Sequence, residues 1–356
     1  MINDMRLLIG GAPSKFFHLQ ELSIALKKYG IDCKLVHDEE FSNGFPNRKV
    51  SNWISNNNRF TKLIDDFKPD IIFVDRLRHF GLNASKTKIP TIIHLRGNYW
   101  KEIEMAKKTQ YKLFPKNIVI KKWESIADEC LKNSEIILPI CNHLTKITKE
   151  HFPNKKIATL YGGISSECWF PSSGIKLKHP CVGLLQGATI WGKTMEMLVL
   201  KKVLEKLPNV TFYWVGDGPF RKEILSELEE YENFIWLGHL DYPNKVREYL
   251  NEIDIYALIS GIDMSPLTLQ EAQLMKKPVI ATNVGGIPEL MKDQETGFLV
   301  EKGNPDDIIE KISTLLENNI RSNEMGDKGR VWVEENFSWN KIAEDFVKIS
   351  KEWIKN

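Results

Sequence analysis

The chain has 356 residues, of which 42% are hydrophobic and 27% charged, and a formal net charge of +2 at pH 7. This length fits two domains of roughly 150 to 180 residues better than a single core. The near-balanced charge argues against a nucleic-acid-binding protein, and no stretch approaches the ~20 uninterrupted apolar residues that a membrane-spanning helix needs.

The first half of the chain alternates short apolar runs with helical patterns. A helix is expected over residues 16–29, and strands are expected at 6–9, 33–36, 71–74, 91–95 and 136–140. This alternation is typical of a parallel sheet covered by helices. The second half repeats the pattern, with strands expected at 181–185, 210–215, 234–237, 255–259 and 279–281.

A stretch rich in Gly, Ser and Pro at residues 161–174 separates the two halves, which suits an interdomain linker. We therefore expect an α/β protein of two Rossmann-like, doubly wound domains, residues 1–170 and 171–336. Residues 337–356 carry apolar side chains at helical spacing, among them Ile342, Phe346 and Ile349. They are predicted to form an amphipathic helix that packs back on the first domain.

The five cysteines form no Cys-x-x-Cys pair and lie in apolar or mixed surroundings. This pattern favours free, buried thiols over a disulfide framework or a sulfur-ligated metal site. Residues 1–10 lack the basic and long apolar segments of a secretory signal, so a cytoplasmic protein is expected.

The segment from strand 255–259 to Glu271 is the most informative for function. The strand ends in a loop that carries Asp263, and a helix is predicted to start near Ser265 and Pro266, because proline suits the first helical position. The free backbone N–H groups of a helix start attract phosphate, and Glu271 lies on the same helix, where it can bind ribose hydroxyls. This predicts a nucleotide site, although a carboxylate before a helix is more often a simple cap.

A second strand-to-helix turn follows this segment. After the expected strand at 279–281 comes Gly-Gly-Ile-Pro-Glu at residues 285–289, in which the glycines allow a tight turn. Two such turns from adjacent strands line the carboxyl edge of an open sheet, where α/β folds bind their ligands.

These residues resemble the retaining glycosyltransferases of family four, also called group 1, whose GT-B fold has two Rossmann-like domains facing a cleft. The family pattern is Glu, seven residues, Glu, then a Gly-x-Pro-Val-Ile-Ala-Thr strand and a Gly-Gly-x-Pro-Glu turn. Asp263 takes the first Glu position and Glu271 the second, and the strand and the turn follow in register. Further similar segments extend the resemblance over residues 180–300: 184–187 with Lys193, 215–219, 236–239 and 296–300.

The resemblance implies roles for the matching residues. Lys193 would neutralise the donor diphosphate, and the backbone N–H groups of Leu267 and Thr268 would bind phosphate. Glu271 would hold the ribose, and Asp263 would contact hydroxyls of the transferred sugar. Considered without the resemblance, a lone Lys193 after a strand is a solvated surface residue.

The resemblance also covers three residues in turns after strands, and two positions depart from the family pattern. The resemblance implies that Gly187 and Gly216 lie in turns beside the phosphates and that His239 lies in the turn that approaches the base. The chain has Ala188 where the family commonly has an arginine, so another basic residue substitutes or diphosphate binding is weaker. Asp263 replaces a glutamate, which shortens the carboxylate arm by one methylene and leaves the donor sugar open.

Two candidates lie in the first half of the chain. Gly11 belongs to a glycine-rich turn at 10–14, whose family counterpart closes over the donor phosphate and the acceptor, and an ordinary tight turn is an equal alternative. His94 ends an apolar strand, and similar enzymes carry there a histidine that faces the transferred sugar. A structural histidine is the alternative.

The segment from Lys101 to Lys122 mixes seven lysines with apolar side chains. A solvated face is the simple interpretation. The alternative is peripheral contact with an anionic membrane, at its inner face, or with an anionic lipid-linked acceptor, because basic residues mixed with apolar ones suit an interface.

The resemblance therefore implies a retaining, hexosyltransferase-like enzyme that moves a sugar from a UDP- or GDP-sugar to a hydroxyl acceptor, such as a glycan or a lipid-linked saccharide. No cofactor or metal site is expected, since no Asp-x-Asp motif occurs where the donor phosphate would bind. The alternatives are a sugar-nucleotide epimerase or hydrolase of the same fold, or an inactive nucleotide-sugar-binding protein. The donor base, the sugar, the acceptor and the oligomeric state stay open.

Overall fold

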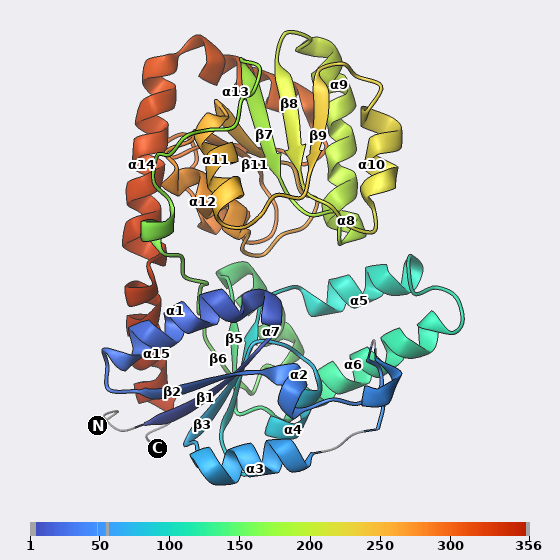
Figure 1. Ribbon diagram of the computed structural model, residues 1–356, viewed down its shortest axis with the longest axis vertical. Coiled ribbons are helices and arrows are strands. Elements are labelled where there is room, and N and C mark those ends of the chain that lie inside the picture. Colours follow the sequence, from blue (N-terminus) through green and yellow to red (C-terminus); the bar gives the residue numbers. More distant parts are fainter. Residues whose placement is uncertain (1–4, 48, 55–56, 354–356) are drawn as a thin grey trace. The chain divides into compact units, whose positions relative to one another are not determined.

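The computed structural model describes residues 5–47, 49–54 and 57–353. The chain divides into two compact units (Figure 1): unit 1 comprises Met1–Gly163 and Trp339–Asn356, and unit 2 comprises Ile164–Ser338. The division falls before residue 170 because the residues after Gly163 form hydrogen bonds with unit 2. The amide of Ile164 donates to the carbonyl of Phe337 (2.9 Å), and Arg330 donates to the carbonyl of Trp169 (2.9 Å).

Unit 1 contains a parallel six-stranded sheet in the order β2-β1-β3-β4-β5-β6. The strands are β1 (Arg6–Gly11), β2 (Asp32–His37), β3 (Ile71–Val74), β4 (Thr91–Leu95), β5 (Ile136–Pro139) and β6 (Lys156–Ile157). The chain leaves β1 toward β2 on one side, and β3 then pairs on the other side of β1. The strand order therefore reverses between β1 and β3, the kind of position at which open α/β sheets bind ligands.

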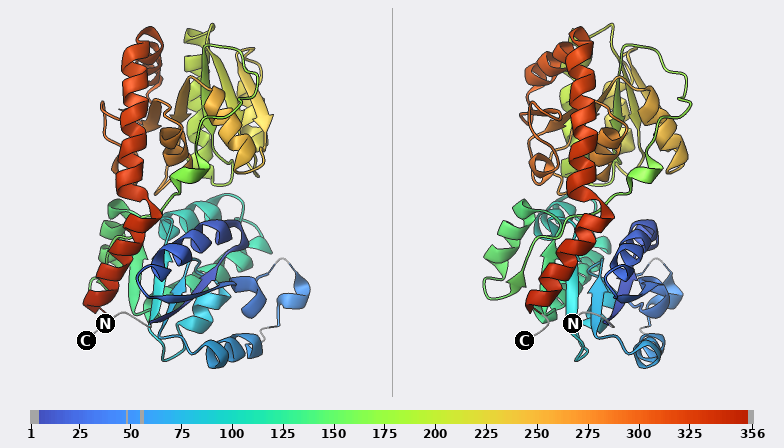
Figure 2. Two further views of the ribbon diagram at one scale, coloured as in Figure 1. Left: turned by 60° about the vertical axis from the view of Figure 1, so that its left-hand side comes forward. Right: turned by 90° about the vertical axis from the view of Figure 1, so that its left-hand side faces the viewer.

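Helices cover both faces of this sheet. They are α1 (Phe16–Lys27), α2 (Asp38–Phe41), α3 (Asn58–Phe67), α4 (His79–Ala84), α5 (Tyr99–Lys108), α6 (Lys116–Asn133), α7 (Asn142–His151) and α15 (Trp339–Trp353). Helices α1 and α15 lie side by side (Figure 2), and the indole of Trp339 donates to Glu21 (2.5 Å). Ile342 and Phe346 of α15 are buried in the core of unit 1. Residues 354–356, the end of the helix predicted from the sequence, lie outside the described residues.

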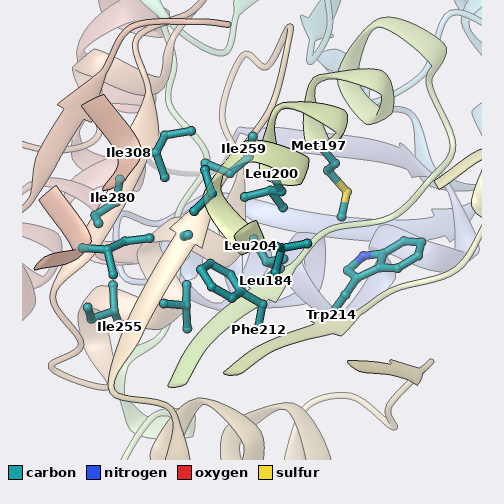
Figure 3. Packing of buried hydrophobic residues seen from close by; sticks show 14 of the residues in the cluster. Leu184, Met197, Leu200, Leu204, Phe212, Trp214, Ile255, Ile259, Ile280 and Ile308 are labelled. Atoms are coloured by element: carbon teal, nitrogen blue, oxygen red, sulfur yellow. The ribbon is translucent and has the colours of Figure 1, made fainter. Parts of the chain in front are cut away.

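Unit 2 contains a second parallel six-stranded sheet, in the order β12-β11-β10-β7-β8-β9. The strands are β7 (Cys181–Leu185), β8 (Thr211–Val215), β9 (Phe234–Gly238), β10 (Ile255–Leu258), β11 (Val279–Thr282) and β12 (Phe298–Val300). Here the strand order reverses between β7 and β10. In Figure 3, side chains of β7, β8 and β10 pack together with Met197, Leu200 and Leu204 in the core of this unit.

The helices of unit 2 are α8 (Trp191–Thr194), α9 (Leu200–Lys206), α10 (Arg221–Leu228), α11 (Asn244–Glu252), α12 (Leu267–Leu274), α13 (Pro305–Glu317) and α14 (Asn319–Phe337). Helix α14 passes so close to the end of α12 that a Cβ on Gly326 would lie 2.0 Å from the carbonyl oxygen of Lys276. The small residue at this position therefore permits the close packing of α14.

The two doubly wound α/β units confirm the predicted fold class. Each of the five cysteines is a thiol outside any disulfide, but Cys33 and Cys168 are only half-buried, so the prediction of buried thiols was wrong for these two. Within the described ranges, no helix is both long enough and apolar enough to cross a membrane.

Candidate functional site

The loops that follow β7 and β10 meet at the strand-order reversal of unit 2. The side chain of Gln186, directly after β7, donates to the carbonyl of Ile259, directly after β10 (2.9 Å). Farther along both loops, the amide of Gly261 donates to the carbonyl of Lys193 (3.3 Å). The backbone thus joins the two segments in which the sequence placed its donor-site residues.

Lys193 and Asp263 form an ion pair across these two loops, between Nζ and Oδ2. Their side chains are 20% and 12% exposed. Charges this poorly solvated are normally paired. The sequence assigned the two residues to different parts of the donor, and the structure brings them together as one charge pair.

The second glycine turn packs directly against the Asp263 loop. Gly285 has φ +59°, and a Cβ there would lie 2.0 Å from the carbonyl oxygen of Asp263. The amide of Gly286 donates to the same carbonyl (3.0 Å). The turns after β10 and β11 therefore meet, as the sequence predicted.

Helix α12 begins at Leu267, and Pro266 is its N-cap rather than its first helical residue. The prediction of the helix start was thus wrong by one to two residues, a common error at helix ends. The first N–H groups of a helix have no partner inside it, and in α12 these belong to Leu267 and Thr268. They are the donors that the sequence assigned to phosphate.

Glu271 and Thr268 of α12 lie beside the buried Tyr256. The Tyr256 hydroxyl donates to Thr268 Oγ1 (2.8 Å). Burial raises the pKa of Tyr256, and the carboxylates of Glu271 and Asp263 raise it further, so the phenol stays a hydrogen-bond donor at neutral pH. Glu271 itself is only 3% exposed. A buried carboxylate is an unusual residue for the first turns of a helix, which suits a specific polar role.

Several buried polar atoms near this reversal have no partner among the described residues. They are Gln186 Oε1, Thr194 Oγ1 and Ser265 Oγ, in the β7 loop, at the end of α8 and before α12. Buried polar groups in native proteins are normally hydrogen-bonded. These atoms are therefore available to a ligand or to bound water.

The glycine turn after β8 stacks on the loop after β7. A Cβ on Gly216 would lie 2.0 Å from the carbonyl oxygen of Gln186, whereas one on Gly187 would meet nothing closer than 3.6 Å. Gly216 is thus required for close packing, whereas a Cβ at Gly187 would make only ordinary van der Waals contacts. His239 follows β9 and is exposed.

Ala188, at the position where the family commonly has arginine, is 1% exposed. Its amide donates to the carbonyl of Asp217 (3.0 Å). A basic residue stands nearby, since Arg221 Nη1 lies 3.1 Å from both carboxylate oxygens of Asp217.

Lys302 is a basic residue at this site that the sequence analysis missed. It follows β12, and its Nζ donates to the carbonyl of Gly261 (3.1 Å), in the loop that ends at Asp263. It belongs to none of the motifs, and only the pairing of β12 beside β11 brings it here, so no local sequence signal could have identified it.

The two candidates of unit 1 are both buried. Gly10 and Gly11 lie inside β1 rather than in the loop after it, so the predicted position of the turn was wrong. A Cβ on Gly11 would lie 2.2 Å from Leu19 Cδ1 of α1. The glycine therefore allows β1 and α1 to approach closely.

His94 is 6% exposed. Its Nε2 lies 3.0 Å from the carbonyl oxygen of Leu160, and its Nδ1 lies 3.8 Å from Asp75 Oδ1. Arg96 binds the same carboxylate (3.0 Å). Although burial alone would raise the pKa of Asp75, Arg96 and His94 hold it below its usual range.

A possible metal-ligand group lies at the opposite, amino edge of the unit 2 sheet. His179, Cys181 and Asp254 each offer a ligand atom within 4.8 Å of the others. The imidazole of His179 lies between two carboxylates, 2.8 Å from Asp254 and 3.1 Å from Glu252, and these hydrogen bonds raise the pKa of His179. An imidazolium held by two carboxylates accounts for this cluster.

The basic segment forms α5, the start of α6 and the connection between them. Several of its lysines have acidic partners: Lys101 and Lys108 pair with Glu104, and Lys107 pairs with Glu124. The connection exposes Leu113 and Phe114, at 74% and 77%. Apolar side chains are thus presented among the lysines.

Comparison with known proteins matches part of the chain to a family. Residues 183–318 match the family described as "Glycosyl transferases group 1". This segment makes up most of unit 2, which is therefore similar to the group 1 glycosyltransferases. The matched segment contains the residues described above at the strand-order reversal of unit 2, from Gln186 to Lys302.

Among curated relatives, N-acetyl-alpha-D-glucosaminyl L-malate synthase of Bacillus anthracis is 28% identical over 232 residues, 62% of this chain and 60% of that protein. The chain therefore spans less than two thirds of the length of this relative.

Solved structures share the GT-B fold across nearly the whole chain. Sucrose-phosphate synthase from Thermosynechococcus elongatus has a TM-score of 0.74 at 14% identity, over 98% of this chain and 99% of that one. HepE from Anabaena in complex with UDP-glucose has a TM-score of 0.69 at 14% identity, over 98% and 100%. The fold expected from the sequence resemblance is confirmed.

Proposed function

We propose that the protein is a retaining glycosyltransferase that moves a sugar from a nucleoside-diphosphate sugar to a hydroxyl acceptor. The observation that carries this proposal is the convergence at the strand-order reversal of unit 2. This region lies within the segment that matches the family. It brings together the Lys193–Asp263 pair, the start of α12 and the buried Glu271.

The proposed division of labour follows from charge. Lys193 balances the negative charge that develops on the leaving diphosphate, and the N–H groups of Leu267 and Thr268 contribute the positive end of the α12 dipole. Lys302 is a second cation for the diphosphate, in place of the arginine that Ala188 replaces. Glu271 accepts hydrogen bonds from the ribose hydroxyls.

Two further side chains have proposed roles: the carboxylate of Asp263 and the imidazole of His94. Asp263 binds hydroxyls of the transferred sugar, and donor binding must then loosen its present pairing with Lys193. In unit 1, His94 is the proposed catalytic residue, and the hydrogen bond between its ring and the carbonyl of Leu160 fixes the ring.

The donor is proposed to be a UDP-sugar. HepE, which shares the fold over almost the full chain, has been solved with UDP-glucose, and this supports uridine over guanosine as the base. His239, at the turn after β9, is proposed to lie near the base. The acceptor is proposed to be a small hydroxyl compound, a glycan or a lipid-linked saccharide.

The exposed Leu113 and Phe114 favour the membrane alternative for the basic segment. We propose that the α5–α6 connection contacts an anionic membrane at the cytoplasmic side, with Lys112 and Lys116 near the lipid phosphates. Flotation with phosphatidylglycerol vesicles at low salt tests this. The protein should float, L113S/F114S should remain at the bottom, and wild-type protein that also stays at the bottom would contradict it.

The donor proposal is tested by thermal shift against UDP, GDP and their glucose and N-acetylglucosamine conjugates, because a ligand of the native state raises its melting temperature. UDP and one UDP-sugar should raise Tm by several degrees, and E271Q should remove the shift. Products formed from a radiolabelled donor with an acceptor panel then test transfer. Conversion of the donor without any acceptor would instead indicate an epimerase or hydrolase.

A further inference from the structure

Unit 1 has a pocket of about 890 Å³ at the carboxyl edge of its own sheet. Its walls come from the segment after β1 (Ala12 and Pro13), the end of β2 with α2 (His37 and Asp38), and the segment after β3 (Arg76 and Arg78). The pocket therefore spans the strand-order reversal between β1 and β3. In open α/β sheets this is the favoured place for a ligand.

One of the two arginines in this pocket is fully neutralised. Arg76 binds Asp38 with two hydrogen bonds, of 2.8 and 2.6 Å, and Glu39 with a third of 3.0 Å. These carboxylates raise the pKa of Arg76 in spite of its burial. The two carboxylates outnumber Arg76 by one charge, and on the pocket wall Glu40 adds a negative charge and Lys49 a positive one.

The other arginine is stacked on an aromatic ring. Within the described part of the chain, Arg78 forms no ion pair, and its guanidinium carbon instead lies 3.6 Å from the ring centroid of Trp123. Burial, and then the neighbouring Arg76, lower the pKa of Arg78 to about 10, so it stays protonated at neutral pH. A half-buried cation without an anion is costly, and the ring of Trp123 leaves the N–H edge of the guanidinium without an acceptor.

The pocket offers a second polar group without a partner. Nδ1 of His37 is buried and has no hydrogen-bond partner in the described residues. The ring is held by stacking on Phe16, with centroids 3.9 Å apart. A planar cation and a fixed imidazole nitrogen in one cavity can both donate to an oxyanion.

We propose that this pocket binds a carboxylate or phosphate group on the acceptor, with Arg78 as its counter-ion and His37 as a second hydrogen-bond donor. The identification of this ligand as the acceptor rests on the proposed function, whereas the binding of an anion does not. It narrows the acceptor to hydroxyl compounds that also carry an acidic group. A carboxylate and a phosphate share the chemistry that a guanidinium recognises, and the test separates them.

The test uses three probes with one carbon skeleton: glycerol, glycerate and glycerol 3-phosphate. Their binding to the full chain is measured by isothermal titration calorimetry and ligand-observed NMR at low salt. The variants are R78Q, which removes the charge, and R78K, which keeps it. The matched control is R6Q, because Arg6 also lies over an aromatic ring of unit 1, that of Phe67 at 4.7 Å, but does not line the pocket.

We expect at least one acidic probe to bind about tenfold or more tightly than glycerol, as for charge-assisted hydrogen bonds. R78Q should abolish this preference, R78K should retain part of it, and R6Q should retain all of it. A preference for glycerate or for glycerol 3-phosphate identifies the acidic group. Equal or undetectable binding of all three probes to the wild type overturns the proposal, as does an unchanged preference in folded R78Q.

UDP binding is measured on the same samples. A protein that prefers the acidic probes but does not bind UDP retains the anion pocket and contradicts only the donor proposal. A protein that binds UDP but shows no acid preference contradicts only the anion pocket. If R78Q does not fold, the preference for an acidic probe is compared among R78K, R6Q and the wild type. A preference that is reduced in R78K and kept in R6Q supports the proposal, and an equal preference in all three contradicts it.

Discussion

Lys193 and Asp263 neutralise each other across the strand-order reversal of unit 2, one from the β7 side and the other from the β10 side. A diphosphate would compete with Asp263 for the Lys193 ammonium. Donor binding would therefore have to break this ion pair. Substitution of the two partners should change the affinity for UDP in opposite directions.

Replacing Asp263 with asparagine should free Lys193 and tighten UDP binding several-fold, because the competing carboxylate is gone. K193Q should weaken UDP binding about tenfold to a hundredfold, the usual range for a lost charge-assisted contact. Isothermal titration calorimetry measures both. The control is K201Q, which removes a lysine from another ion pair of unit 2, with Glu227. Equal weakening by D263N and K193Q would show that the pair is structural.

The glutamate-to-glutamine change at Glu271 should distinguish ribose binding from simple burial. If the carboxylate accepts hydrogen bonds from the ribose, E271Q should weaken binding of UDP about tenfold or more, while inorganic pyrophosphate binding is unchanged. Competition calorimetry with the two ligands measures this. The control variant Q270E changes the neighbouring buried side chain of α12. Loss of pyrophosphate binding as well would indicate that E271Q distorts α12 itself.

The sheets and the motif spacing could be predicted because they depend on local patterns. Each expected strand became a strand, since buried parallel strands are continuous apolar runs. The meeting of the Asp263 and Gly285 turns followed from their place after adjacent strands. The Lys193–Asp263 pair and Lys302 could not be predicted, because their contacts join segments about 70 and 41 positions apart, which only the strand order brings together.

The glycines of β1 were assigned wrongly and Arg78 was missed, in both cases because tertiary contacts decide what these residues do. Gly10 and Gly11 were assigned to a loop because glycine favours turns, yet both extend β1, where tertiary packing against Phe80 and Leu19 leaves no room for a side chain. Glycine in a strand often marks such a close approach. Arg78 was not identified at all, because nothing local distinguishes a stacked, unpaired arginine from an exposed one.

The glycine turn that supports Asp263 should tolerate no side chain. Ala at Gly285 meets both an unfavourable positive φ and a backbone contact of 2.0 Å, whereas Gly303, with φ +75°, has nothing within 4 Å. G303A should thus lower the unfolding free energy by about 1 kcal/mol, and G285A by about 3 kcal/mol or more. Urea denaturation measures both. Equal losses would mean that the turn can move away from Asp263.

His179 should make stability depend on pH. Its pKa is raised above 6.5 in the folded state by Asp254, and then by Glu252. A raised folded pKa contributes stability that is complete below about pH 6.5, the unfolded value. That contribution is lost as the pH rises through the folded pKa. Thermal melts between pH 6 and pH 9 should show a decline that H179Q reduces, and an identical decline in H179Q would contradict this.

The most direct test of the central claim is the affinity of the full chain for UDP, measured by isothermal titration calorimetry on the wild type, E271Q and K193Q. The account predicts a one-to-one complex that both substitutions weaken about tenfold or more in variants that circular dichroism shows to be folded. Absence of UDP binding by the folded protein, or equal affinity in all three proteins, would contradict a donor site at the strand-order reversal of unit 2.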